Sequence, residues 1–167
     1  MTISMYQVSI PVFLRMLGNL RTFLNKAEAY AQEHSIEPAA LLTARLYPNM
    51  YTLVQQVQIA TDAAKGCGAR LAGLDVPSFP DTESSFAEIK ARVEKTVEFL
   101  KTLRPEQIDG SEERDIALTI AKETMHFTGL NYLLNFAMPN FYFHVTTAYA
   151  LLRHNGLPLG KRDFLAL

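Results

Sequence analysis

The stretch SFAEIKARVEKTVEFL, residues 85–100, indicates an amphipathic helix more clearly than any other part of the chain. Charged residues, Arg92 among them, fall on its polar sides. Ser85 and Glu88 stand three apart at its start, which is the spacing of a capping box. We therefore expect a helix that starts at Thr82 or Ser84 and ends before Pro105. Its apolar residues recur at spacings of three and four along one face; they are Phe86, Ile89, Val93, Val97 and Leu100.

Three other segments have helical periodicity, at about 4–33, 50–71 and 129–154. The first begins near Ser4 or, if Pro11 takes the first helical position, about five residues later. The last is apolar on most sides, as expected of a helix buried among others. Four long apolar-faced segments joined by loops predict an all-α fold, a four-helix bundle.

The parts between these helices are less regular. A short helix is expected after Pro38, and the two prolines of segment 73–81 indicate a loop. Residues 115–127 alternate only partly between polar and apolar, so a short β-hairpin before the last long helix stands there beside irregular or helical structure. Pro139 should kink or split that helix. The tail, 157–167, is expected to be extended or irregular.

Composition narrows the class of protein. A chain of 167 residues suits one domain, residues 1–167, that buries roughly 70% of its unfolded surface. The net charge is −1 without a Lys/Arg block, which argues against a nucleic-acid partner. No run reaches the ~18 apolar residues of a membrane span. Because Cys67 is the one cysteine, we expect no disulfide and a cytoplasmic location.

His144 is the residue most open to a chemical role. It lies mid-helix on the side that holds Leu151, so it should point inward. A buried histidine can bind a metal, act as a base or hydrogen-bond within the core. Gln56 lies at helical spacing from the apolar Leu53, and a buried glutamine needs hydrogen-bond partners. His144 is a candidate partner for Gln56 across the bundle.

Motif spacing alone predicts neither a zinc site nor a nucleophile. The chain has no HxxxH or HExxH pair, whereas zinc sites use three or four protein ligands. Cys67 stands between two glycines without a CxxC partner, and no base can be placed beside it.

Several stretches carry a family resemblance. They are PNFYFHVTTAY at 139–149, LRHNG at 152–156, GKRDF at 160–164, MY at 5–6, and residues 50–56. Together they resemble a bacterial family of unknown function of about this length, over nearly the whole chain. That family is similar in turn to the DinB/YfiT-like superfamily of proposed metalloenzymes.

The resemblance implies a four-helix bundle that is often a homodimer. Metal-binding members of the superfamily use three histidines, one on the second helix and two spaced four apart on the last long helix. On this chain the pair falls at Asn140 and His144, and the single position falls near Gln56. Two of the three histidines are therefore absent, and amides are weak ligands for such metals. We expect no cofactor, with a divalent metal at His144 as the alternative.

Several functions stay open at this point. One is a small-molecule-binding protein or enzyme relic with a degenerate metal site, whose candidate pocket is formed by His144, Asn140 and Gln56. A second is a purely structural or interaction protein, a homodimeric bundle. A third is an active metal- and thiol-dependent transferase, since some members of the superfamily have that activity. A binding role predicts a cavity between helices, whereas a dimer predicts a large exposed apolar helix face.

Overall fold

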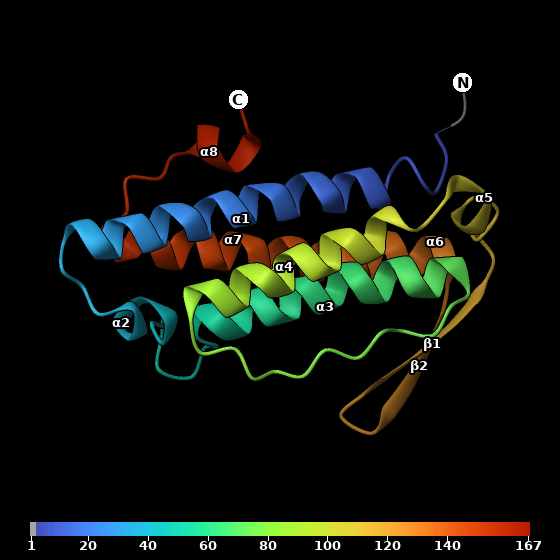
Figure 1. Ribbon diagram of the computed structural model, residues 1–167. Coiled ribbons are helices and arrows are strands. Elements are labelled where there is room, and N and C mark those ends of the chain that lie inside the picture. The colour runs from blue at the N-terminus through green and yellow to red at the C-terminus, as the bar shows by residue number, and fades with distance from the viewer. Residues whose placement is uncertain (1–2) are drawn as a thin grey trace.

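The computed structural model describes residues 3–167 and shows four long helices packed side by side, with a hairpin at one end (Figure 1). The predicted bundle is therefore confirmed. Its long helices are α1 (Ile10–Glu33), α3 (Leu53–Ala72), α4 (Phe86–Lys101) and α7 (Met138–His154). The shorter helices are α2 (Pro38–Leu42), α5 (Pro105–Ile108), α6 (Gly129–Tyr132) and α8 (Lys161–Leu165). In this described part of the chain, no helix is both long and apolar enough to cross a membrane.

The apolar faces of the long helices meet in a hydrophobic core. α3 packs against α7 and α4, and α1 packs against α4 and α7. Ile89 and Val93 of α4 are fully buried, as their spacing predicts, and burial of such a side chain contributes about 1.5–3 kcal/mol. The prediction for Arg92 is wrong, because this arginine is buried as well.

Helix starts follow from local capping. Ser9 is the N-cap of α1, so the later of the two predicted starts is the observed one, with Pro11 in the first turn. Ser85 caps α4, because its hydroxyl accepts a hydrogen bond from the Glu88 backbone N–H at 3.2 Å. The Glu88 carboxylate in turn accepts from the backbone N–H of Ser84 at 2.8 Å. The predicted pairing of Ser85 with Glu88 is confirmed, but α4 begins at Phe86, later than the predicted start at Thr82 or Ser84.

Residues 115–128 form the hairpin that the sequence left open. β1 (Asp115–Ile120) pairs antiparallel with β2 (Glu123–Thr128). The two turn residues, Ala121 and Lys122, have φ values of 48° and 76°, as a two-residue hairpin turn requires. Only β1 alternates between buried and exposed positions, whereas β2 is exposed almost throughout. That one-sided burial explains the weak alternation in the sequence.

The last long helix accommodates Pro139 by means of a wider, π-helical turn just before it. The chain is helical from Gly129 to His154, but the segment η1 (Leu133–Ala137) between α6 and α7 is a π-helix. Pro139 has no N–H to donate to the carbonyl of Asn135, and its ring would clash with that carbonyl in a regular helix. A π turn relieves this conflict without splitting the helix.

The expectation for the tail is wrong in part, because residues 161–165 form α8. The backbone N–H of Gly160 donates to the Asp163 carboxylate at 2.7 Å, which closes the first turn. Asp163 also pairs with Lys26 of α1. The Phe164 ring stacks on Phe23 of α1 with 6.2 Å between centroids. These contacts hold α8 against α1. Figure 1 shows the two helices next to each other.

Candidate functional site

His144 and Gln56 meet in the interior of the bundle. The Nδ1 atom of His144 lies 2.7 Å from the Oε1 atom of Gln56, and both side chains are buried. The Nε2 atom of Gln56 donates to the carbonyl of Tyr51 at 3.3 Å, which turns the amide oxygen toward the imidazole. The structure thus confirms the predicted hydrogen bond between α3 and α7.

This hydrogen bond sets the protonation of the ring. Because the Gln56 oxygen can only accept, the proton lies on Nδ1 of His144 and the lone pair on Nε2. Burial lowers the pKa of His144, which favours the neutral ring at pH 7. Among residues 3–167, the one fully enclosed side-chain nitrogen or oxygen without a partner is Oγ of Ser111. Within the same residues, the hydrogen bond of the His144 ring is the one at Nδ1.

Asn140 lies near the other two candidate residues but, in the part of the chain that the structure describes, makes no hydrogen bond to them. It lies one turn before His144 on α7 and is half-buried. Within the described chain its side chain makes no hydrogen bond to His144 or to Gln56. Two of the three candidate residues are therefore in contact, and the third lies on the same face of the helix.

The donor atoms at these three positions do not fit a metal held by three histidines. Only one imidazole is present, and its Nδ1 atom is engaged with the amide oxygen of Gln56. Amides are weak ligands for such metals. In residues 3–167 no group of three or more His, Cys, Asp or Glu side chains could hold a metal ion.

A surface hollow lies beside His144 on α7. Its volume is about 370 Å³. Phe143 and Thr147, which flank His144 on the helix, line it, but His144 itself does not. The hollow is therefore next to the candidate residues and is not built from them. Its remaining lining residues are Leu46, Tyr142, Thr146 and Ala150.

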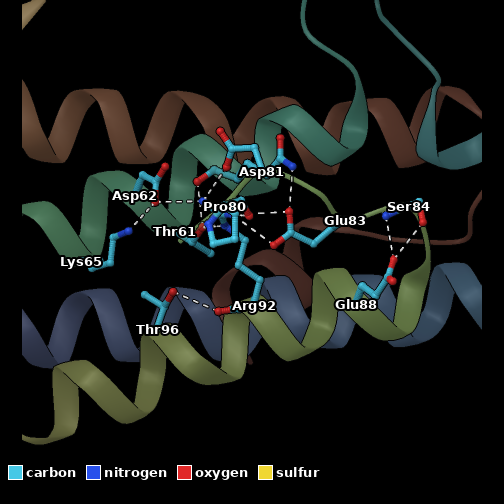
Figure 2. Close-up of polar contacts among 11 residues, drawn as sticks. Thr61, Asp62, Lys65, Pro80, Asp81, Glu83, Ser84, Glu88, Arg92 and Thr96 are labelled. Atoms are coloured by element: carbon cyan, nitrogen blue, oxygen red, sulfur yellow. Dashed lines mark hydrogen bonds and ion pairs between the residues drawn. The ribbon is translucent and has the colours of Figure 1, made fainter. Parts of the chain in front are cut away.

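A second polar cluster surrounds Arg92 of α4 (Figure 2). The Arg92 side chain is 1% exposed and lies between α3 and the loop that precedes α4. Its guanidinium nitrogens lie between 2.8 and 3.1 Å from oxygen atoms of five residues. The partners are Thr61, Asp62, Pro80, Asp81 and Glu83.

The carboxylates compensate for the burial of this arginine. Burial alone would lower the pKa of Arg92, but the hydrogen bond to Glu83 and the neighbouring acids raise it instead. Burial likewise acts to raise the pKa of Glu83, but hydrogen bonds from Gln58 and Arg92 outweigh it and hold that pKa below its usual value. All three guanidinium nitrogens have partners, so Arg92 offers no free donor to a ligand.

The cluster fastens the 73–84 loop to the bundle. Phe79 of the loop lies between two ammonium groups, with its ring centroid 3.9 Å from Nζ of Lys65 and 4.1 Å from Nζ of Lys95. Lys65 is itself buried and pairs with Asp62 at 2.8 Å. Sequence reasoning missed this cluster, although Arg92 stands three residues after the buried Ile89.

Comparison with known proteins bears on the whole chain. The family described as a domain of unknown function, DUF1993, matches residues 5–165. A crystal structure of a DinB family member protein from Shewanella denitrificans has a TM-score of 0.88 and 35% sequence identity, and the match covers 96% of this chain and 90% of that chain. No curated protein matches. The chain therefore belongs to the DUF1993 family and has a DinB-like fold.

Proposed function

We propose that this chain is a small-molecule-binding member of the DinB-like bundles, in which His144 accepts a hydrogen bond from the ligand without a metal. The observation that carries the proposal is the 2.7 Å hydrogen bond between Nδ1 of His144 and Oε1 of Gln56. It holds the ring in one tautomer, with the lone pair of Nε2 available. Gln56 is then a positioning residue, since it orients the imidazole.

The Nε2 atom of His144 determines which class of ligand we propose. A neutral imidazole with a lone pair on Nε2 accepts a hydrogen bond from a hydroxyl group or, more weakly, from a thiol. The neighbouring hollow offers Phe143 and Thr147 as further contacts. Small alcohols, phenols and thiols are therefore the compounds to screen. The metal- and thiol-dependent transferase has less support, because one imidazole and two amides form a poor metal site.

The first test combines metal content with ligand binding. Mass spectrometry of the purified, tag-free protein should find no stoichiometric metal. A screen of small alcohols, phenols and thiols by protein-observed NMR should yield compounds that shift the His144 signals and that His144→Phe no longer binds. Gln56→Met should weaken the same compounds, because the ring loses its fixed tautomer.

Two outcomes would count against the proposal. Stoichiometric metal in the wild-type protein that is lost in His144→Ala would revive a metal site. Compounds that bind His144→Phe as well as the wild-type protein would remove His144 from the binding site.

A homodimeric bundle is a second candidate function, and exposed apolar side chains on α6, η1 and α7 favour it. Leu130 and Leu134, and further along Phe143, are large apolar residues about half exposed to solvent. Exposed apolar side chains are typical of protein interfaces when they gather into one patch. Light scattering coupled to gel filtration should then show a dimer that Phe143→Glu dissociates. Leu74→Glu, at an exposed leucine in the loop after α3, should leave it intact; a wild-type monomer would reject this candidate.

A further inference from the structure

A hollow of about 410 Å³ lies where α1, α7 and α8 meet. It is separate from the hollow beside His144, although Tyr142 borders both. Its walls are largely apolar, and the main apolar side chains are Val12 and Met16 from α1 with Phe164 and Leu165 from α8. Two residues with polar groups, Arg15 and Tyr142, also line it.

The guanidinium of Arg15 has N–H donors beyond those that bond to the protein itself. Its Nη2 atom donates to the carbonyl of Leu165 at 2.7 Å. No carboxylate of residues 3–167 lies within ion-pair distance of it, whereas Arg21, six residues further along α1, pairs with Glu94 at 2.6 Å. A guanidinium has five N–H donors, and two parallel donors match one carboxylate. Arg15 therefore retains donors for an anion at the edge of an apolar hollow.

Contacts within the protein hold α8 in place as one wall of the hollow, so no ligand is needed to form that wall. The Nδ2 atom of Asn19 donates to the carbonyl of Phe164 at 2.8 Å, and Lys26 pairs with Asp163. The Phe164 ring packs against Phe23 and Tyr149 in the bundle. Several contacts besides the hydrogen bond from Arg15 to Leu165 thus hold α8 against the bundle.

We propose that this hollow binds a small carboxylic acid with an apolar body, such as a medium-chain fatty acid. The carboxylate pairs with Arg15 and accepts a hydrogen bond from the Tyr142 hydroxyl. The apolar body lies against Val12, Met16 and Phe164. Charge complementarity selects this class: a neutral apolar molecule leaves Arg15 without an anion, and a small inorganic anion leaves the apolar walls uncovered.

Isothermal titration calorimetry with octanoate tests the proposal, with 1-octanol as a neutral probe of the same chain length. Octanoate should bind the wild-type protein saturably at one site, and more tightly than 1-octanol. Arg15→Gln should weaken octanoate roughly five- to tenfold, the loss expected for a partly exposed charge-assisted hydrogen bond. The same variant should leave 1-octanol binding unchanged.

Three further variants separate this site from general effects. Arg21→Gln removes the same charge from the same helix and should not change octanoate binding. Val12→Trp fills the hollow without touching Arg15 and should abolish binding of both probes. Tyr142→Phe leaves the contacts of α8 intact and should weaken octanoate at least about twofold, the low end for one lost hydrogen bond.

The proposal is overturned if octanoate does not saturate, or if 1-octanol binds as tightly. Equal losses in Arg15→Gln and Arg21→Gln would also overturn it, as would unchanged binding in Val12→Trp or in Tyr142→Phe. Circular dichroism of each variant verifies that the bundle is folded, and the NMR signals of Phe164 report whether α8 stays docked.

Discussion

Replacing Arg92 by methionine should be among the most destabilising single changes in the bundle. Methionine keeps much of the length and apolar bulk of the side chain but removes the charge and every donor. The Glu83 carboxylate, the Thr61 hydroxyl and the carbonyl of Pro80 each lose a hydrogen bond. Asp62 and Asp81 lose an ion pair.

The exposure of the partners sets the magnitude. Removal of one member of a fully buried ion pair costs about 3–5 kcal/mol. Here the side chains of Asp62 and Asp81 are 42% and 60% exposed, so water can solvate them again after the substitution. Glu83, at 12%, is the one carboxylate left largely buried, and it keeps its hydrogen bond from Gln58. We therefore expect a loss of about 2–3 kcal/mol in the free energy of unfolding.

Urea denaturation with linear extrapolation measures this loss. Arg21→Met is the matched control, because the pair between Arg21 and Glu94 is about half exposed and should contribute less than about 1 kcal/mol. Hydrogen exchange of residues 73–84 should accelerate in Arg92→Met alone, since this arginine holds the loop. A loss below about 1 kcal/mol, or one equal to that of Arg21→Met, would refute the reasoning.

Three more predictions concern other parts of the fold. Gly129→Ala should cost at least about 2 kcal/mol in urea denaturation, because the new Cβ would lie 2.0 Å from the Ser111 carbonyl oxygen; a neutral substitution would contradict that contact. Ser85→Ala should lower the unfolding free energy by about 1 kcal/mol through loss of the α4 cap, and an unchanged melting temperature would argue against the cap. Burial lowers the pKa of His144 below 6.5, so the unfolded chain binds that proton first and stability should fall as the pH drops from 6.5 through the lowered pKa. His144→Gln should flatten this part of the pH–stability curve, and identical slopes would refute the assignment.

Features that depend on the spacing of neighbouring residues could be predicted from the sequence. The apolar face of α4 and its capping box involve residues at most four apart, so periodicity and composition suffice to find them. The contact between His144 and Gln56 is long-range, yet it was also predictable. Each residue lies on an inward face of its helix, and a buried polar side chain must find a partner.

Features that depend on contacts between segments far apart in the chain could not be predicted from the sequence. Arg92 looks like a surface residue because its carboxylate partners at 62, 81 and 83 come from α3 and from a loop whose path no periodicity determines. The helix of the tail is too short for a periodic pattern, and its stability comes from docking on α1. The free Nε2 atom of His144 depends on side-chain packing at a level of detail that spacing does not resolve.

The π turn at Leu133–Ala137 changes which residues of α6 and α7 share a face, so one helical wheel cannot describe both helices. A regular helix advances about 100° per residue, and a π turn accommodates roughly one extra residue. Positions before Leu133 are therefore displaced by about one such step relative to positions after Ala137. A single projection places either the Tyr132 end or the His144 end on the wrong side. Relatives that lack the wide turn should align with this chain only through a one-residue gap within these five positions.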